Sequence, residues 1–150
     1  MTEPRSGPER KAHALAVFDA VDGDVWVATA SAAGVVHMVP LSYAWDGARL
    51  IIAIEPTSVT ARNLQETRRA RLGFGPTRDI VLVDAKLDGV QSGPSGDEVA
   101  KIYARQADWD PRQETNAYAY FVLRPVRIQA WREANELAGR TLMRDGVWLP

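Results

Sequence analysis

The stretch VVHMVPLSYAWDGARLIIAI, residues 35–54, decides the fold class that this sequence predicts. Residues 35–45 carry an apolar or aromatic side chain at almost every odd position, the period of two that is typical of a β-strand. Asp46-Gly47 favours the tight turn of a β-hairpin. After Arg49, residues 50–54 are apolar on both faces, which predicts a central strand. This stretch therefore predicts two antiparallel strands joined by a hairpin.

Four further segments predict strands around this hairpin. They are rich in β-branched and aromatic residues and cover 25–31, 69–74, 79–90 and 118–130. Short connections such as Ala33-Gly34 favour antiparallel pairing. Six antiparallel strands with one buried face close into a barrel or pack as a sandwich, so the expected class is mainly β (α+β). Strands that do not alternate with long helices argue against a parallel sheet.

Helices are expected before, between and after these strands. Residues 8–21 place Ala14, Leu15, Phe18 and Val21 at helical spacing. Short helices are also expected at 58–67 and before Asp110-Pro111. We interpret residues 1–7 as a flexible tail and residues 8–150 as a single domain.

Composition narrows the function classes. The chain has 150 residues, 46% hydrophobic and 25% charged, as in ordinary globular proteins. It has no cysteine, which excludes disulfides, zinc–thiolate sites and iron–sulfur clusters. A net charge of −1 argues against a general nucleic-acid partner. We find no apolar run of about 20 residues and no secretory leader, so we expect no membrane partner and a cytoplasmic location.

The segment Pro-Thr-Ser-Val-Thr-Ala-Arg-Asn-Leu, residues 56–64, is the first candidate site. Hydroxyls and free amides at a helix start attract anions, and Arg62 adds a charge that can grip phosphate. Residues 62–78 hold five arginines and one glutamate, a local charge of +4. In the alternative interpretation, Ser58 only caps the helix and the arginines only face solvent.

Two other segments are candidates. In His37-Met38-Val39-Pro40, the proline removes a ladder hydrogen bond, so a flat ligand could lie against the freed backbone. His37 itself is better explained as a core histidine, and with only one other histidine, His13, we expect no metal site. The segment 123–132 ends in Trp131-Arg132 and could reach a ligand or a partner subunit, or could be a strand end with solvated arginines.

Taken in order, residues 25–31, 35–41, 49–54, 58–64 and 123–131 resemble the pyridoxamine 5′-phosphate oxidase-like flavin-binding proteins. The resemblance extends from about Pro8 to Leu149. It implies a six-stranded antiparallel split β-barrel with a Greek-key core and short flanking helices. It also implies a homodimer with FMN at the subunit interface.

The same resemblance implies site residues. Ser58, Thr60, Arg62 and Asn63 would hold the phosphate, with residues 37–40 beside the isoalloxazine ring. Thr60 stands where many relatives have lysine or arginine, so Arg62, helped by Arg78, would hold most of the charge. Trp131 and Arg132 would come from the neighbouring subunit. The expected cofactor-binding residues are Ser58, Thr60, Arg62, Asn63, His37, Met38, Val39, Pro40, Arg78, Trp131 and Arg132.

The expected function is that of an FMN-dependent oxidoreductase acting on a small organic substrate. A flavin performs the hydride chemistry, and the protein binds and orients it. This agrees with the lack of an evident acid–base pair, and we predict no catalytic residue. A deazaflavin-dependent reductase and a non-catalytic protein that binds flavin, haem or another tetrapyrrole are the alternatives.

Overall fold

The computed structural model describes residues 2–150, apart from the side chain of Ser95. One antiparallel sheet dominates it, in the order β2-β1-β5-β6-β7-β4-β3, and β8 pairs with β7 and β9. The strands are β1 (Asp24–Ala30), β2 (Val36–Ser42), β3 (Ala44–Trp45), β4 (Leu50–Ile54), β5 (Arg69–Phe74), β6 (Ile80–Gln91), β7 (Ala119–Trp131), β8 (Thr141–Arg144) and β9 (Val147–Trp148). The predicted fold class and its six strands are confirmed, and the β8–β9 hairpin is additional.

The expected strand at 35–45 is interrupted at Tyr43, and this break shapes the barrel. Its two halves, β2 and β3, form the two ends of the strand order. Tyr43 turns into the core, where its hydroxyl donates to the Val17 carbonyl at 2.5 Å. Burial raises the pKa of Tyr43 to about 12. Within residues 2–150 no ladder joins β2 to β4, so the barrel is split along this line.

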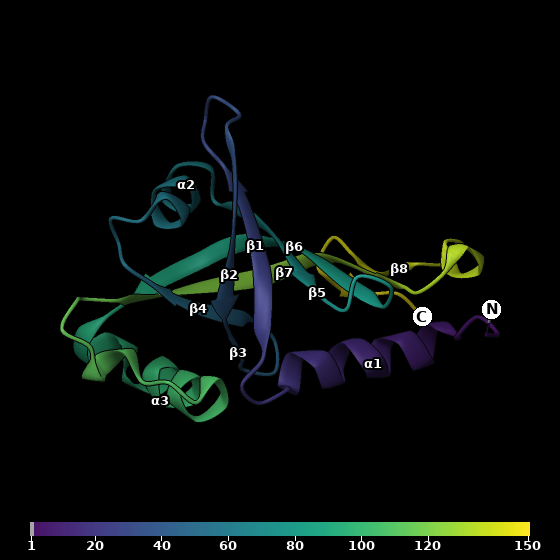
Figure 1. Cartoon of the computed structure of the whole chain (residues 1–150), viewed down its shortest axis with the longest axis horizontal. Helices are drawn as coiled ribbons and strands as arrows, with labels where there is room; N and C mark the ends of the chain where they lie inside the picture. Colours follow the sequence, from purple (N-terminus) through teal and green to yellow (C-terminus); the bar gives the residue numbers. More distant parts are fainter. Residues whose placement is uncertain (1) are drawn as a thin grey trace.

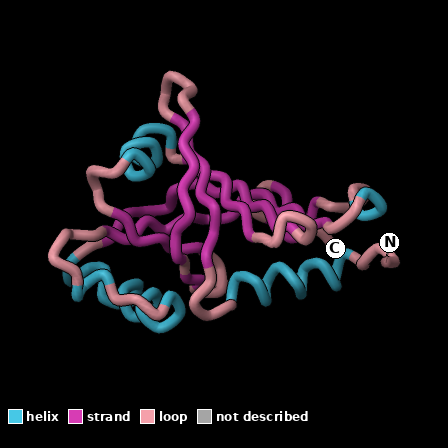
Figure 2. The backbone as a smooth tube through the Cα atoms, viewed as in Figure 1, coloured by secondary structure: helices cyan, strands magenta, loops and turns pink. Residues whose placement is uncertain are grey.

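Residues 2–150 form three α-helices around the sheet, α1 (Gly7–Asp19), α2 (Val59–Thr67) and α3 (Asp97–Ala107). Three single-turn 3-10 helices lie at Gly93–Gly96, Pro111–Gln113 and Ala134–Glu136. In the view of Figure 1, α1 and α3 lie below the sheet and α2 lies above it, beside the projecting β1–β2 hairpin. Figure 2 shows the strands as one continuous central band with the helices at its periphery. No helix formed by the described residues has both the length and the apolar character needed to cross a bilayer.

The core has two parts, which explains why β4 is apolar on both faces. Leu50 and Ile52 face the barrel interior with Phe18 and Leu72. Ile51 faces the other way, into a smaller cluster around α3. The expectation that 49–54 is a strand buried on both sides is thus met from Leu50 onward, where all five residues of β4 are buried.

Gln106 of α3 joins three elements of the fold. Its buried amide donates to the carbonyls of Phe18, at 2.6 Å, and Ala20, at 3.0 Å, at the end of α1. Its amide oxygen accepts from the Trp45 backbone N–H at 2.8 Å. One side chain therefore satisfies the exposed carbonyls of a helix end and the edge of β3.

A charged network fixes the N-terminal segment against residues 132–138. The Glu136 carboxylate, whose side chain is 1% exposed, accepts from the Arg5 backbone at 2.7 Å and the Arg5 guanidinium at 2.9 Å. It also accepts from the Arg132 backbone at 2.8 Å. Buried Arg10 donates to the Ala130 and Glu136 carbonyls. Met1 lies outside the described residues, and the expected domain boundary at residue 7 stays a prediction.

Candidate functional site

A cleft of about 440 Å³ lies at the split in the barrel, between β2 and β4. Residues from β2, the end of β4, the start of α2, and α3 with the loop that follows it form its walls. The lining residues are His37, Val39, Pro40, Leu41, Ser42, Ala53, Ile54, Glu55, Ser58, Thr60, Tyr103, Trp109 and Tyr118. The cleft therefore lies where no backbone ladder closes the sheet.

The start of α2 supplies polar groups to one side of the cleft. Ser58 caps the helix, and its Oγ accepts from the Ala61 N–H at 3.1 Å. Thr60 is buried and lines the cleft. The first amides of a helix have no intrahelical acceptor and carry the positive end of its dipole. This corner of the cleft can therefore receive a negatively charged group.

Three aromatic residues form the opposite wall. The Trp109 ring lies edge-on to both Tyr103, at 6.0 Å between centroids, and Tyr118, at 5.2 Å. The Trp109 indole N–H donates to Glu114 at 2.9 Å, which fixes the ring. Burial is the main cause that raises the pKa of Tyr103, and hydrogen bonds with the Ala53 backbone and the Ser42 side chain oppose it. Tyr103 lines the same cleft as Ser42 of β2 and Ala53 of β4.

The cleft is nearly free of positive charge. Among the described residues, no arginine or lysine lines it, whereas Glu55 does and accepts from Asn116 at 2.9 Å. The arginines of 62–78 spread elsewhere: Arg68 bonds the Leu87 carbonyl at 2.8 Å, and Arg69 and Arg71 are exposed on β5. The charge counted in the sequence is therefore not gathered at the start of α2.

Five of the eight residues expected near the ring and phosphate, 37–40 and Ser58, Thr60, Arg62 and Asn63, come together in the cleft. His37, Val39, Pro40, Ser58 and Thr60 all line it. Met38 is exposed at 61% and does not line it. Asn63 is buried and donates to Thr29 Oγ1 at 3.1 Å, so it joins α2 to β1 instead.

Comparison with known protein families shows to which family this chain belongs. A sequence model of the family described as pyridoxamine 5′-phosphate oxidase matches residues 24–132. The chain belongs to this family. No curated protein sequence matches the chain closely enough to count as a relative.

Solved structures with the same fold are distant in sequence. An F420 reductase is 16% identical, with a TM-score of 0.62 over 75% of this chain and 94% of that chain. Campylobacter jejuni ChuZ is 13% identical, with a TM-score of 0.70 over 99% and 67% of the two chains. A heme binding protein from Mycobacterium smegmatis is 18% identical, with a TM-score of 0.61 over 97% and 60%. The fold of the pyridoxamine 5′-phosphate oxidase family is thus shared with all three.

Three of the expected cofactor-binding residues lie at the far end of the barrel. Trp131 and Arg132 were expected from a neighbouring subunit, whereas Arg78 was expected to help Arg62 hold the phosphate. Arg78 is exposed and pairs with Glu133 at 3.6 Å, and Arg132 pairs with Glu136 at 3.5 Å. Trp131 ends β7, whereas Ala119, which begins β7, pairs with Ile54 at the cleft. Twelve steps of about 3.3 Å separate the two ends of β7 by roughly 40 Å. Arg78, Trp131 and Arg132 therefore cannot reach the cleft of their own chain.

The family resemblance implies FMN as the cofactor. The groups around the cleft between β2 and β4 match FMN in part. The aromatic wall and the apolar β2 side chains suit a planar ring. The hydroxyls of Ser58 and Thr60 and the α2 amides suit its phosphate. The Arg62 side chain is exposed and makes no hydrogen bond or ion pair with any residue in 2–150, so its guanidinium is available to the same group. Its backbone N–H donates to the Ser58 carbonyl at 3.0 Å. The residues present thus fit the cofactor, with exposed Arg62 as the cation.

Sequence reasoning missed the aromatic wall and Glu55. Tyr103 shares an apolar helix face with Val99, which indicates burial but not the element that covers it. Nothing in the local pattern places α3 against β4. Among residues 2–150, no three His, Asp or Glu side chains gather where they could hold a metal ion.

Proposed function

We propose that this chain binds FMN in the cleft between β2 and β4 and acts as a flavin-dependent oxidoreductase on a small organic substrate. The observation that carries the proposal is that one cleft combines an aromatic wall, the free edge of β2 and the hydroxyl-bearing start of α2. A planar ring with a phosphate tail requires that combination. When bound, the flavin supplies hydride transfer.

The chain's own residues have separate tasks in this proposal. Trp109 and Tyr118 cover one side of the ring and exclude water. Ser58 and Thr60 donate hydrogen bonds to the phosphate, while the α2 amides and Arg62 balance its charge. Tyr103 completes the aromatic wall between the β2 and β4 sides of the cleft.

Arg62→Gln should weaken FMN binding about 10- to 100-fold, because it removes a charged hydrogen bond worth about 1.5–3 kcal/mol. The measurement is a titration of FMN into apoprotein, followed by quenching of flavin fluorescence. The control is Arg105→Gln, which removes an exposed arginine from α3 and should leave affinity unchanged. Equal FMN affinity in Arg62→Gln and the parent protein would remove Arg62 from the site.

The same titration with a deazaflavin coenzyme distinguishes the proposed FMN enzyme from the main alternative, a deazaflavin-dependent reductase. Saturable binding of the deazaflavin with no binding of FMN would reassign the cofactor and keep the cleft. Failure of both ligands to bind would contradict the proposed function itself.

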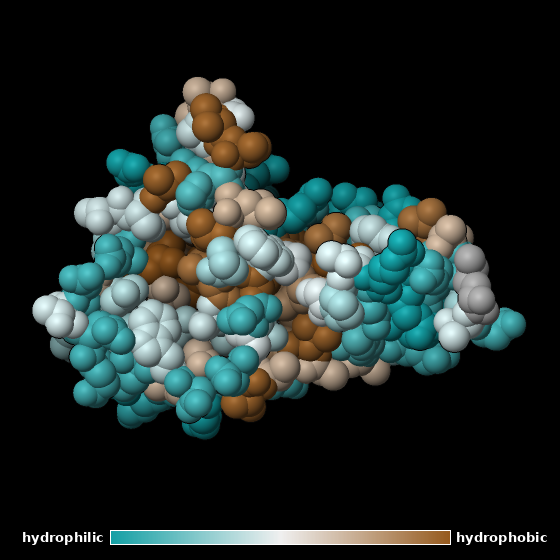
Figure 3. Space-filling view, viewed as in Figure 1, coloured by the Kyte–Doolittle hydropathy of each residue, from teal (hydrophilic) through white to brown (hydrophobic). Residues whose placement is uncertain are grey.

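We further propose that the protein is a homodimer through the outer face of the β1–β2 hairpin. Register pairs Trp26 with Pro40, Ala28 with Met38 and Ala30 with Val36, so these apolar side chains share one face. Trp26 is 50% exposed and Val36 is 82% exposed. Figure 3 shows hydrophobic surface at the tip of this hairpin. A second copy would cover this face and bring its own Arg78, Trp131 and Arg132 toward the cleft.

Met38→Lys should weaken the dimer at least 100-fold, because it buries an unpaired charge in an apolar contact. Sedimentation of a dilution series measures the dissociation constant. Val147→Lys, at an exposed apolar residue of β9, is the matched control and should not change it. A dimer of unchanged affinity in Met38→Lys would place the interface elsewhere.

A further inference from the structure

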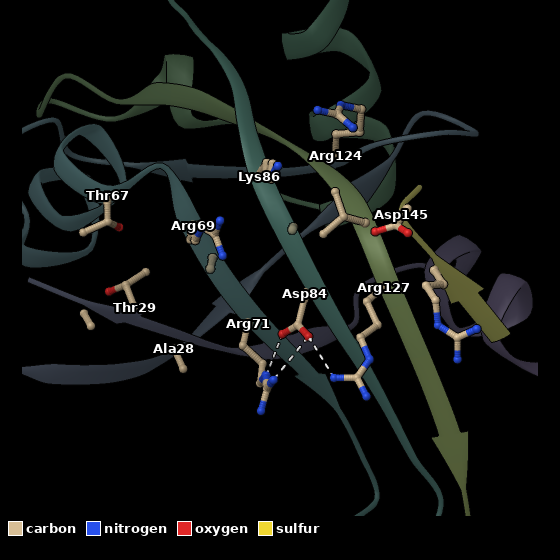
Figure 4. A pocket seen from close by; sticks show the side chains of 15 residues that line it. Ala28, Thr29, Thr67, Arg69, Arg71, Asp84, Lys86, Arg124, Arg127 and Asp145 are labelled. Atoms are coloured by element: carbon tan, nitrogen blue, oxygen red, sulfur yellow. Dashed lines mark hydrogen bonds and ion pairs between the residues drawn. The ribbon is translucent and has the colours of Figure 1, made fainter. Parts of the chain in front are cut away.

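One cavity of about 770 Å³, shown in Figure 4, opens on the outer face of the sheet. Ala28 and Ala30 line it, so it borders the face that we assign to a second copy. A different cavity, of about 330 Å³, lies between the start of α3, the 3-10 helix Pro111–Gln113 and the start of β7. None of its lining residues belongs to the β1–β2 hairpin. The proposed dimer therefore uses none of the residues that form this cavity.

Tyr120, near the start of β7, brings an unpaired polar group to this cavity. The residue is 4% exposed, and its hydroxyl has no hydrogen-bond partner among the described residues. Its ring lies edge-on to Tyr103, with the centroids 5.7 Å apart. Burial is the main cause that raises the pKa of Tyr120, while Asp110 raises it further and Arg112 lowers it. The hydroxyl therefore lies toward these two residues, at the cavity.

Two groups of the cavity can donate to a ligand. Arg112 pairs with Asp110 through Nε, at 2.9 Å, and Nη2, at 2.8 Å, which leaves Nη1 without a bond in the part of the chain that the structure describes. The Tyr120 hydroxyl is the second donor. A buried hydroxyl without a partner destabilises a fold, and native proteins contain few such groups. A guanidinium and a phenol that face one cavity suit a carboxylate, which accepts from both.

Two carboxylates of the same cavity can accept from a ligand. Asp97, in the first turn of α3, makes no side-chain hydrogen bond or ion pair within the described residues. Glu114 uses only Oε1, which accepts from the Trp109 indole at 2.9 Å, so its second oxygen is free there. The cavity therefore carries charges of both signs, which disfavours a simple anion and a simple cation alike. A ligand that satisfies both pairs of groups carries a carboxylate and an ammonium group.

We propose that this cavity binds a free α-amino acid with a short apolar side chain. The carboxylate of the amino acid accepts from Arg112 and from the Tyr120 hydroxyl. Its ammonium group donates to Asp97 and Glu114. The volume lies at the lower end of the range for small-molecule pockets, about 300–1,000 Å³, so the ligand must be small. Apolar residues that can contact a short side chain also line the cavity: Ala100, Pro111 and Ala117.

This site adjoins the cofactor cleft without depending on it. Tyr118 lines both cavities, and no other lining residue is shared. Binding of an amino acid here requires no FMN, so it can be measured on the apoprotein and holds or fails independently of the proposed function.

Calorimetric titration of the full-length apoprotein with L-valine tests the proposal. Isovalerate is L-valine without its ammonium group, and isobutylamine is L-valine without its carboxylate. L-Valine should bind with saturation and at least about tenfold more tightly than either, because each smaller molecule has lost a charged hydrogen bond. Equal affinity for isovalerate or isobutylamine would indicate a site for a single charge and overturn the proposal, as would the lack of saturable L-valine binding.

Charge variants of the cavity have matched controls on α3. Arg112→Gln and Asp97→Asn should each weaken L-valine binding about tenfold or more. Arg105→Gln and Glu98→Gln change exposed residues that do not line the cavity and should leave the affinity unchanged. Unchanged affinity in Arg112→Gln and Asp97→Asn would overturn the site. An equal loss in Asp97→Asn and Glu98→Gln would also overturn it, because the general charge at the start of α3 would then be responsible.

Tyr120→Phe tests the unpaired hydroxyl by a second measurement. The variant should keep or raise the melting temperature of the free protein, because it removes a buried hydroxyl that has no partner. Saturating L-valine should raise the melting temperature of the parent protein more than that of Tyr120→Phe. An equal rise in both proteins would show that the hydroxyl does not contact the ligand and would overturn the proposed arrangement.

Discussion

Glu136→Gln is expected to lower the free energy of unfolding by about 3 kcal/mol at neutral pH, because removing one partner of a buried ion pair leaves the other unpaired. The carboxylate accepts two bonds from the Arg5 guanidinium and one from each of two backbone amides. Asp79 lies 3.0 Å from Arg5 and retains part of the charge balance, which keeps the loss near the lower end of the usual range. Urea unfolding measures it.

The pH dependence of this loss identifies its cause. Hydrogen bonds from Arg5 hold the pKa of Glu136 well below its usual range. The ionised Glu136 carboxylate therefore stabilises the fold fully above its pKa in the unfolded chain, about 4.3. This stabilisation is lost progressively as the pH falls toward the lower pKa of Glu136 in the folded protein. The difference between parent and Glu136→Gln should narrow below about pH 4. A difference that stays constant down to pH 3 would show that the ionised carboxylate is not responsible.

Glu133→Gln is the matched control for this experiment. Glu133 lies three residues away, and its partner Arg78 is 83% exposed. Surface ion pairs contribute about 0–1 kcal/mol, so this variant should stay within that range. If both variants lost about 3 kcal/mol of the free energy of unfolding, the cause would be a general sensitivity of residues 132–138 to substitution and not the buried Arg5–Glu136 pair.

Phe18→Ala should lower the free energy of unfolding by about 3–5 kcal/mol, the range for removing a buried aromatic side chain. Phe18 is fully buried at the end of α1. Its ring centroid lies 4.8 Å from that of Trp45 on β3 and 5.3 Å from that of Phe74 on β5. The substitution leaves a cavity where α1, β3 and β5 pack together. Chemical denaturation followed by tryptophan fluorescence measures the loss.

Val21→Ala is the control for Phe18→Ala. Both residues share the helical spacing of the sequence, but Val21 is 70% exposed beyond the end of α1. Its truncation should change stability by less than about 0.5 kcal/mol. A loss below 1 kcal/mol in Phe18→Ala would mean that α1 contributes little to holding the barrel together.

These two positions illustrate what the sequence predicts and what it does not. Local signals located the strands within one or two residues, because Asp46-Gly47 and the alternation around it act over short distances. They did not reveal the interruption at Tyr43, because the apolar alternation continues through it. The bond from Tyr43 to α1 that ends β2 joins residues 26 positions apart.

The sequence likewise predicted one part of the candidate site and missed another. His37 and Ser58 reach one cleft, as the order of segments and the family resemblance predicted. The aromatic wall depends on α3 lying against β4, which no periodicity indicates. The arginines after α2 were counted as one cluster, but a strand sends Arg69 and Arg71 to its exposed face while Ala70 points inward. Arginines that are close in the sequence therefore need not be close to one another in the fold.

The open line between β2 and β4 has a mechanical consequence. Side chains span it: Tyr103 of α3 lines the cleft together with Ser42 of β2 and Ala53 of β4. Widening the gap therefore breaks no strand ladder, so the local free energy of opening is far below that of global unfolding. We therefore expect the cleft to open along the line between β2 and β4 while the other strand pairs stay in register, so that a ligand wider than the cleft at rest can enter.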